Sequence, residues 1–158
     1  MSDYTMYPHP RGWANPVTLR ADGILTPAWV ASGETNIWTA TGVTLGFTYE
    51  RGAAGGAVDW QLEVSPYSVA ALVPAGFSEW ISESVYSAGA VVLGADTQSD
   101  VTREFQTYKS TGAGDEDFAY SLELPTPVER IRIQVRESAA DGVPGTPGNL
   151  NVIMIVRG

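Results

Sequence analysis

The chain has 158 residues, a length that suits one domain with a single hydrophobic core. Hydrophobic residues make up 44% and charged residues 17%, with 17 glycines and 10 prolines, which favours short strands joined by turns over long helices. Nine basic against eighteen acidic side chains leave a formal net charge of −9, so we expect no nucleic-acid partner. Because the sequence has no cysteine, thiol nucleophiles, disulfides and thiolate metal sites are excluded.

Neither a targeting segment nor a membrane span is evident in the sequence. The first fifteen residues lack the apolar stretch of a signal peptide. The longest nearly apolar stretch, residues 88–95, is too short to cross a bilayer. We therefore expect a soluble protein without a membrane partner.

Residues 1–34 are predicted to form an extended N-terminal arm, because they show no sustained period of 2 or 3.6 and their prolines disfavour a helix. Ordering the first sixteen residues costs on the order of 1–2 kcal/mol each, whereas burying an aromatic side chain returns roughly 1.5–3 kcal/mol. Either the chain's own sandwich or a neighbouring molecule must therefore hold the arm, and we favour neighbouring subunits. The expected partner contacts are Tyr4, Met6, Tyr7, His9 and Trp13.

Residues 35–158 are predicted to form the folded domain, starting with two alternating strands. Apolar side chains occupy every second position in residues 43–49 and again in residues 58–64. The glycine-rich residues 51–56 between them predict a hairpin. Asp59 and Glu63 are expected on its solvated face, about 13 Å apart along a straight strand.

The second half of the chain repeats the strand pattern. Residues 118–124, 131–135 and 150–157 alternate, and the last of these has apolar residues on both faces, as in a central strand. Residues 65–72 are expected to contain a helical turn, and residues 101–109 a strand. Roughly seven to nine short strands without a long helix predict an all-β antiparallel β-sandwich, jelly-roll-like.

The sequence offers few groups for catalysis. His9 is the only histidine and Lys109 the only lysine, and no nucleophile elbow, phosphate-binding loop or dinucleotide fingerprint is present. A carboxylate glycosidase would need a pair such as Glu79 and Glu83. The acidic residues 115–117 lack the spacing of a calcium loop and are interpreted as a charged turn. We expect a non-enzymatic protein with no cofactor and no metal.

Two further features point to binding. Arg130, Arg132 and Arg136 share one strand face, where they could meet an acidic protein surface or form an intrachain salt-bridge ladder. Trp80 is the tryptophan least committed to the core or the arm and could stack on a sugar ring. A carbohydrate-binding or adhesion module is therefore the alternative function.

The arm, the cysteine-free sandwich, and a closing region of residues 129–137 followed by residues 147–152 resemble small virion proteins of tailed bacteriophages. Among these the chain is most similar to jelly-roll capsid decoration (cement) proteins. The resemblance implies a homotrimer on the exterior of the capsid, binding the major capsid protein or another virion protein through its arm and a sandwich edge. Head-fibre and tail-associated sandwich proteins share this pattern.

Overall fold

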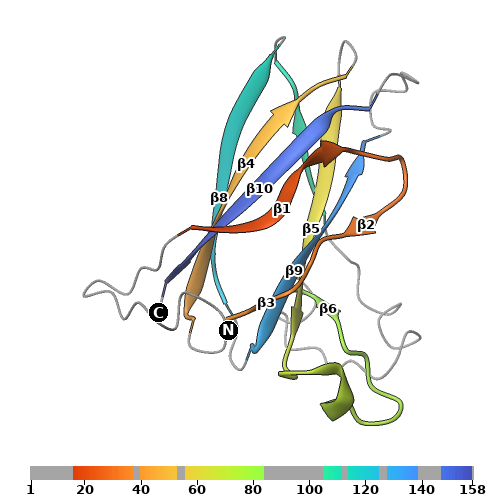
Figure 1. Cartoon of the computed structure of the whole chain (residues 1–158), viewed down its shortest axis with the longest axis vertical. Helices are drawn as coiled ribbons and strands as arrows, with labels where there is room; N and C mark the ends of the chain where they lie inside the picture. Colours follow the sequence, from red (N-terminus) through yellow and green to blue (C-terminus); the bar gives the residue numbers. More distant parts are fainter. Residues whose placement is uncertain are drawn as a thin grey trace.

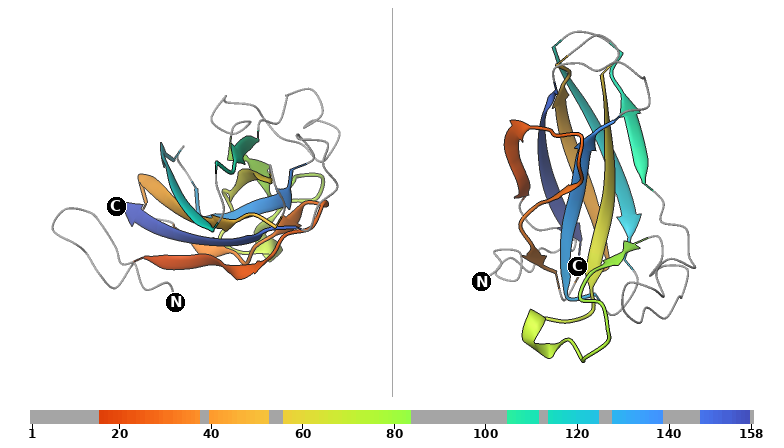
Figure 2. Two further views of the ribbon diagram at one scale, coloured as in Figure 1. Left: turned by 90° about the horizontal axis from the view of Figure 1, so that it is seen from above. Right: turned by 90° about the vertical axis from the view of Figure 1, so that its right-hand side faces the viewer.

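The computed structural model describes residues 16–37, 40–52, 56–83, 105–111, 114–124, 128–138 and 147–157. Two antiparallel sheets face each other and enclose one core, as Figures 1 and 2 show. The first sheet has the order β1 (Val17–Ile24), β10 (Asn149–Arg157), β4 (Gly42–Glu50) and β8 (Asp115–Glu123).

The second sheet is built around β9 (Arg130–Glu137) and β5 (Ala57–Ser65), which pair with each other. The short strands β2 (Val30–Ala31) and β3 (Thr35–Asn36) both pair with β9. Two more, β6 (Ile81–Ser82) and β7 (Gln106–Lys109), both pair with β5. A 3-10 turn, η2 (Ala70–Leu72), lies between β5 and β6.

The strand order is that of a jelly roll. If β2 and β3 count as one position beside β9, and β6 and β7 as one position beside β5, both sheets have four positions. The chain then crosses between the sheets from β1 to β2, from β3 to β4, from β4 to β5, from β7 to β8, from β8 to β9 and from β9 to β10, whereas β5, β6 and β7 stay in the second sheet. The predicted all-β antiparallel sandwich is confirmed.

The hairpin predicted across residues 51–56 is wrong. The strand β4 pairs with β10 and β8, whereas β5 pairs with β9, β6 and β7, so the two strands lie in opposite sheets. Their apolar faces meet across the core, where the rings of Phe47 and Trp60 lie 4.9 Å apart. Alternation tells which side chains are buried but does not tell which strand is the neighbour. The same side chains are buried whether β4 and β5 pair in one sheet or face each other across the core.

The boundary of the predicted arm also needs correction. Residues 17–24 form β1 beside β10, and residues 30–31 form β2 beside β9, so the sandwich begins at Val17 and not at residue 35. The pairing of β1 has irregularities between Thr18 and Arg20 and between Arg20 and Gly23, which break the period of 2. The arm residues Tyr4, Met6, Tyr7, His9 and Trp13 lie outside the described residues.

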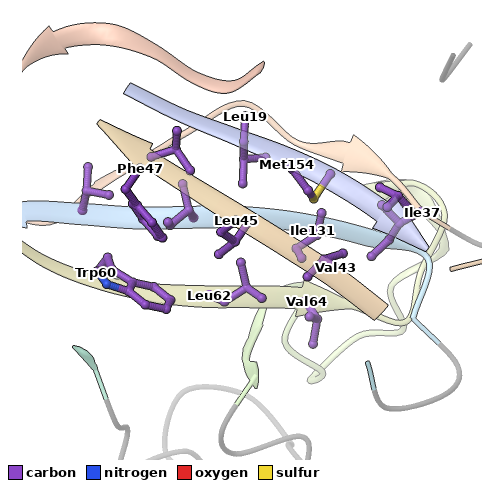
Figure 3. Close-up of a cluster of buried hydrophobic side chains, with 14 of the residues drawn as sticks. Leu19, Ile37, Val43, Leu45, Phe47, Trp60, Leu62, Val64, Ile131 and Met154 are labelled. Atoms are coloured by element: carbon purple, nitrogen blue, oxygen red, sulfur yellow. The ribbon is translucent and has the colours of Figure 1, made fainter. Parts of the chain in front are cut away.

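The core is formed by the inward faces of the long strands of both sheets, and Figure 3 shows its side chains. Leu45 and Phe47 of β4 pack toward Trp60 and Leu62 of β5, and all four are at most 5% exposed. The strand β10 lies between β1 and β4, which confirms its prediction as a central strand. Because one face of β5 and one face of β9 pack into this core, the side chains at the alternate positions of both strands point away from it.

Candidate interaction surfaces

The outer face of β5 is not a solvated face, contrary to the sequence prediction. Asp59, Gln61 and Glu63 point away from the core but are only 2%, 7% and 3% exposed. The strand β5 has neighbours on both edges, and long side chains from β9 lie across it. Buried carboxylates need partners, and arginines of β9 supply them for Asp59 and Glu63.

The network joins β5 to β9 by cross-strand ion pairs. Glu63 and Arg132 are directly opposite, with Nε and Oε1 2.7 Å apart, and Asp59 and Arg136 are opposite at 2.8 Å between Nε and Oδ2. Gln134 also donates to Glu63 Oε1 at 2.9 Å. The sequence left open whether the arginines meet an acidic protein surface or form an intrachain salt-bridge ladder. The structure contains the intrachain ladder.

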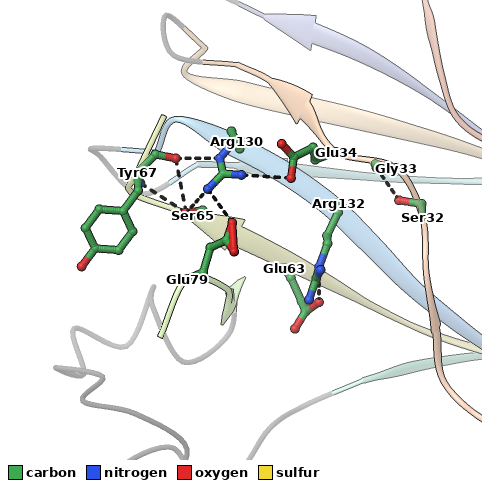
Figure 4. Close-up of polar contacts among 9 residues, drawn as sticks. All are labelled: Ser32, Gly33, Glu34, Glu63, Ser65, Tyr67, Glu79, Arg130 and Arg132. Carbon is green, nitrogen blue, oxygen red and sulfur yellow. Dashed lines mark hydrogen bonds and ion pairs between the residues drawn. The ribbon is translucent and has the colours of Figure 1, made fainter. Parts of the chain in front are cut away.

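Arg130 is the buried end of this ladder, with a side chain only 2% exposed (Figure 4). Its guanidinium binds Glu34 and Glu79, each at 2.9 Å, and its Nε donates to the carbonyl of Tyr67 at 2.7 Å. The expected partner contact at Arg130 is therefore corrected: the side chain is occupied inside its own chain. Arg132 and Arg136 keep 24% and 29% exposure.

Aromatic rings cover the same arginines. The guanidinium carbons of Arg130 and Arg132 lie 4.9 and 4.4 Å from the ring centre of Trp80. Arg136 lies 4.4 Å from the ring centre of Trp29 and 5.0 Å from that of Phe105. These are cation–π distances. A sugar ring that stacked on Trp80 would have to share the ring with these guanidinium groups.

Trp29 and Phe105 were not predicted as part of this surface. The sequence places Trp29 in the arm, and Phe105 lies far along the chain. They meet Arg136 only because β2 pairs with β9 and β7 pairs with β5. No local sequence signal could have found this arrangement, since it depends on the strand order.

The predicted acidic candidates have structural partners. Glu79 is paired with Arg130, and Asp117 accepts a hydrogen bond from Thr48 Oγ1 at 2.8 Å. Glu116 accepts hydrogen bonds from the backbone N–H of Thr111 at 2.9 Å and from the Tyr108 hydroxyl at 3.1 Å, which ties β7 to β8. Among the described residues, no group of three or more histidine or acidic side chains could hold a metal ion.

A second polar cluster lies where β4 and β9 end and β10 begins. The Tyr49 hydroxyl and the Gly148 N–H both donate to the Glu137 carboxylate, at 3.1 Å each. Burial raises the pKa of Glu137 above its ordinary value, against the opposing effect of these two hydrogen bonds. Burial also raises the pKa of Tyr49, with the charge of Glu137 as the next cause, so this hydroxyl remains a donor.

The edge strand β8 offers an open side. In the described part of the chain, β8 pairs with β4 and with no strand on its other edge. Phe118 stacks on Phe47 and on Tyr108, with ring centres 4.5 and 3.9 Å apart, while Tyr120 is 37% exposed. A hollow of about 300 Å³ lies on the paired side of β8, where residues 121–123 line it together with residues 42–44 of β4 and Arg157 of β10. An unpaired edge with partly covered aromatic side chains is suited to strand addition.

No described helix is long and apolar enough to cross a membrane. No protein-family model and no curated protein matches the chain. Solved structures with a similar fold include T=1 particles derived from infectious bursal virus, at a TM-score of 0.50 and 12% identity, over 90% of this chain and 31% of that chain. The chain thus spans about a third of the length of the viral chains that it matches.

Two binding domains are also similar in structure. A CBM4 structure matches at a TM-score of 0.40 and 13% identity, over 92% of this chain and 68% of that chain. The K1 cleaved adhesin domain of Lys-gingipain from Porphyromonas gingivalis matches at a TM-score of 0.46 and 8% identity, over 82% of this chain and 63% of that chain. Identities this low establish the fold alone. The chain is a jelly-roll β-sandwich, and its fold is similar to that of a chain from virus-derived particles.

Proposed function

We propose that the chain is a non-enzymatic structural protein of a viral particle, which binds the capsid lattice from outside and stabilises it as a decoration (cement) protein. The observation that carries this proposal is the fold. Over 90% of this chain it is similar to part of a chain from T=1 particles derived from infectious bursal virus. The proposed partner is the major capsid protein or another virion protein, and the proposed assembly is a homotrimer.

Two parts of the chain are proposed to make the contacts. One is the first fifteen residues, whose aromatic side chains precede the start of β1. The other is the edge of β8 on which no described strand lies, where a strand of the partner can add to the first sheet. The outer face of β5 and β9 is a weaker candidate, because its charges are paired within the chain.

The test measures co-sedimentation of the full chain with undecorated capsids of the virus that encodes it. Replacing Tyr7 and Trp13 by alanine should abolish co-sedimentation, while an Arg51→Ala control outside both surfaces should bind like the wild type. Both variants must keep the circular dichroism of the wild type. If the wild-type chain fails to bind capsids, the proposed function is wrong. If the wild type binds and the arm variant binds equally well, the arm is not the contact.

A carbohydrate-binding or adhesion module is the second candidate. It is favoured by one observation, the rings of Trp29, Trp80 and Phe105 along the outer face of the second sheet. A glycan array with the wild type and Trp80→Ala separates the two functions. Binding to a glycan that is lost in Trp80→Ala supports the module, and an array without Trp80-dependent binding removes it.

A further inference from the structure

The outer face of β5 and β9 carries three cross-strand polar pairs, which are Asp59–Arg136, Gln61–Gln134 and Glu63–Arg132. We call these six residues the polar row. The two ion pairs lie at its ends and the two amides in its middle. Because each arginine is paired with one carboxylate, the row as a whole carries no net charge.

The arginines of the polar row have N–H donors that the ion pairs do not use. Arg132 and Arg136 each bind their carboxylate through Nε, at 2.7 and 2.8 Å. Within the described part of the chain, the Nη groups of these two arginines donate no hydrogen bond. Both side chains are partly open to solvent. The row therefore offers planar N–H donors without offering a net charge.

Gln61, in the middle of the row, is a buried amide without a hydrogen-bond partner. Its residue is only 7% exposed, and among the described residues its side chain takes part in no hydrogen bond. Gln134, directly opposite, donates to Glu63 and not to Gln61. A buried amide that lacks a partner is unfavourable, so Gln61 calls for a partner that the described chain does not supply.

A gap in the second sheet lies beside Gln61. The strand β6 pairs with residues 63–64 and β7 with residues 57–60, so no described strand lies beside residues 61–62 on that edge of β5. A hollow of about 60 Å³ lies there, lined among others by Gln61, Ser82, Glu83, Gln106 and Tyr120. Its volume is that of about two water molecules, which is also enough for one small polar group of a ligand.

We propose that the polar row and this hollow bind an uncharged oligosaccharide. Neighbouring hydroxyls of a sugar ring match the planar amide and guanidinium groups, because both present two polar atoms side by side. A charged ligand gains little, since the arginines are already paired and the chain has a net charge of −9. The inference deepens the second candidate function, on which it rests, and does not depend on capsid binding.

The layout of this face disfavours a protein partner. Protein interfaces are depleted of charged residues at their centre and place polar residues at the rim. Here the polar row is central, and aromatic rings lie beside its two arginines, Trp80 beside Arg132, and Trp29 and Phe105 beside Arg136. The two arginines are four residues apart on β9, about 13 Å along a straight strand, which is longer than one sugar ring. An oligosaccharide fits, because its hydroxyls can meet the row while its C–H groups contact the rings.

An oligosaccharide array probed with the full chain tests the proposal. It carries uncharged oligomers of glucose, galactose and mannose beside uronate-containing and sulfated oligomers of matched length. The wild type should bind an uncharged oligomer, and Arg132→Lys/Arg136→Lys should bind it about tenfold more weakly in titration calorimetry. Lysine keeps a positive charge for Glu63 and Asp59 but lacks the Nη groups. Arg157→Lys, at an exposed pair on β10, is the matched control and should bind like the wild type.

Gln61→Leu tests the same site without touching an ion pair. Leucine removes the unpartnered amide, so the variant should melt no lower than the wild type and yet bind the oligomer more weakly. This variant decides if the arginine double variant loses the circular dichroism of the wild type. A wild type that binds no oligomer on the array overturns both the inference and the carbohydrate-binding candidate. Equal binding by the wild type and the deciding variant overturns the inference alone, as does binding confined to the acidic oligomers.

Discussion

Arg132 on β9 and Glu63 on β5 form an ion pair whose two members differ in their access to water. Their Nε and Oε1 atoms lie 2.7 Å apart, yet the Arg132 side chain is 24% exposed and that of Glu63 is 4% exposed. If the pair is broken, Arg132 can turn toward solvent, whereas Glu63 stays buried. The two halves of the pair should therefore differ in what their removal costs.

The first prediction is that Arg132→Met destabilises the protein more than Glu63→Gln does. Arg132→Met leaves a buried carboxylate that accepts a hydrogen bond from Gln134 but has lost its charged partner, and we expect a loss of about 2–4 kcal/mol in the free energy of unfolding. Glu63→Gln leaves an arginine whose side chain is 24% exposed, and we expect a loss of about 1–2 kcal/mol. Urea unfolding at neutral pH measures both values.

The exposed pair between Arg157 and Glu123 is the control for this measurement. Glu123 is 86% exposed and 3.3 Å from Arg157, so Glu123→Gln should change stability by less than about 0.5 kcal/mol. Equal losses in Arg132→Met and Glu63→Gln would show that the difference in burial has no energetic consequence.

The second prediction concerns the pH dependence that Glu137 gives to stability. Because burial raises its pKa in the folded state above the ordinary value of 4.5, the folded protein holds this proton to higher pH than the unfolded chain. Its contribution to stability is thus complete below the ordinary pKa and is lost as the pH rises through the folded pKa. Asp59 acts in the same direction, and the hydrogen bonds from Gly148 and Tyr49 oppose it.

Glu137→Gln removes this titration and keeps an oxygen acceptor for Tyr49 and Gly148. Relative to the variant, the wild type should lose stability as the pH is raised from about 4 toward neutrality. Urea midpoints measured at a series of pH values and constant ionic strength give the difference. A difference that is constant with pH, or one that grows in favour of the wild type, would contradict the assigned direction.

The third prediction concerns Gly148, which precedes β10. A Cβ atom on this residue would lie 2.5 Å from the carbonyl oxygen of Glu50 and 2.6 Å from a ring carbon of Tyr49. Because a backbone atom and a buried ring must both move, we expect Gly148→Ala to cost about 1–3 kcal/mol in thermal or urea unfolding. Gly33→Ala is the control, since its Cβ would meet nothing within 4 Å. Equal stability of the two variants would argue against a tight approach at Gly148.

The sequence was sufficient to predict the sandwich but not the arrangement of its strands. Alternation identified the inward faces of β4, β9 and β10, where burial follows a period of 2, whereas every residue of β5 is buried. It gave no information on neighbours, so β4 and β5 were predicted as a hairpin although they face each other across the core.

The candidate surfaces depended on the same missing information. Asp59 and Glu63 have the alternation of a solvated face, and only the pairing of β5 with β9 shows that the arginines cover them. Trp29 and Phe105 come together through strands that are distant in sequence.

The last prediction is that Arg130 holds the loop of residues 66–78, between β5 and β6, by its geometry and not by its charge alone. The planar guanidinium donates to Glu34, Glu79 and the carbonyl of Tyr67 at once, which a lysine ammonium at the end of a flexible stem cannot reproduce. Arg130→Lys should therefore cost about 1–3 kcal/mol in stability and speed chymotrypsin cleavage within residues 66–78. Arg157→Lys, at an exposed pair, should change neither measurement. If Arg130→Lys were destabilised while cleavage within the loop stayed as slow as in the wild type, Arg130 would stabilise the sheet without ordering the loop.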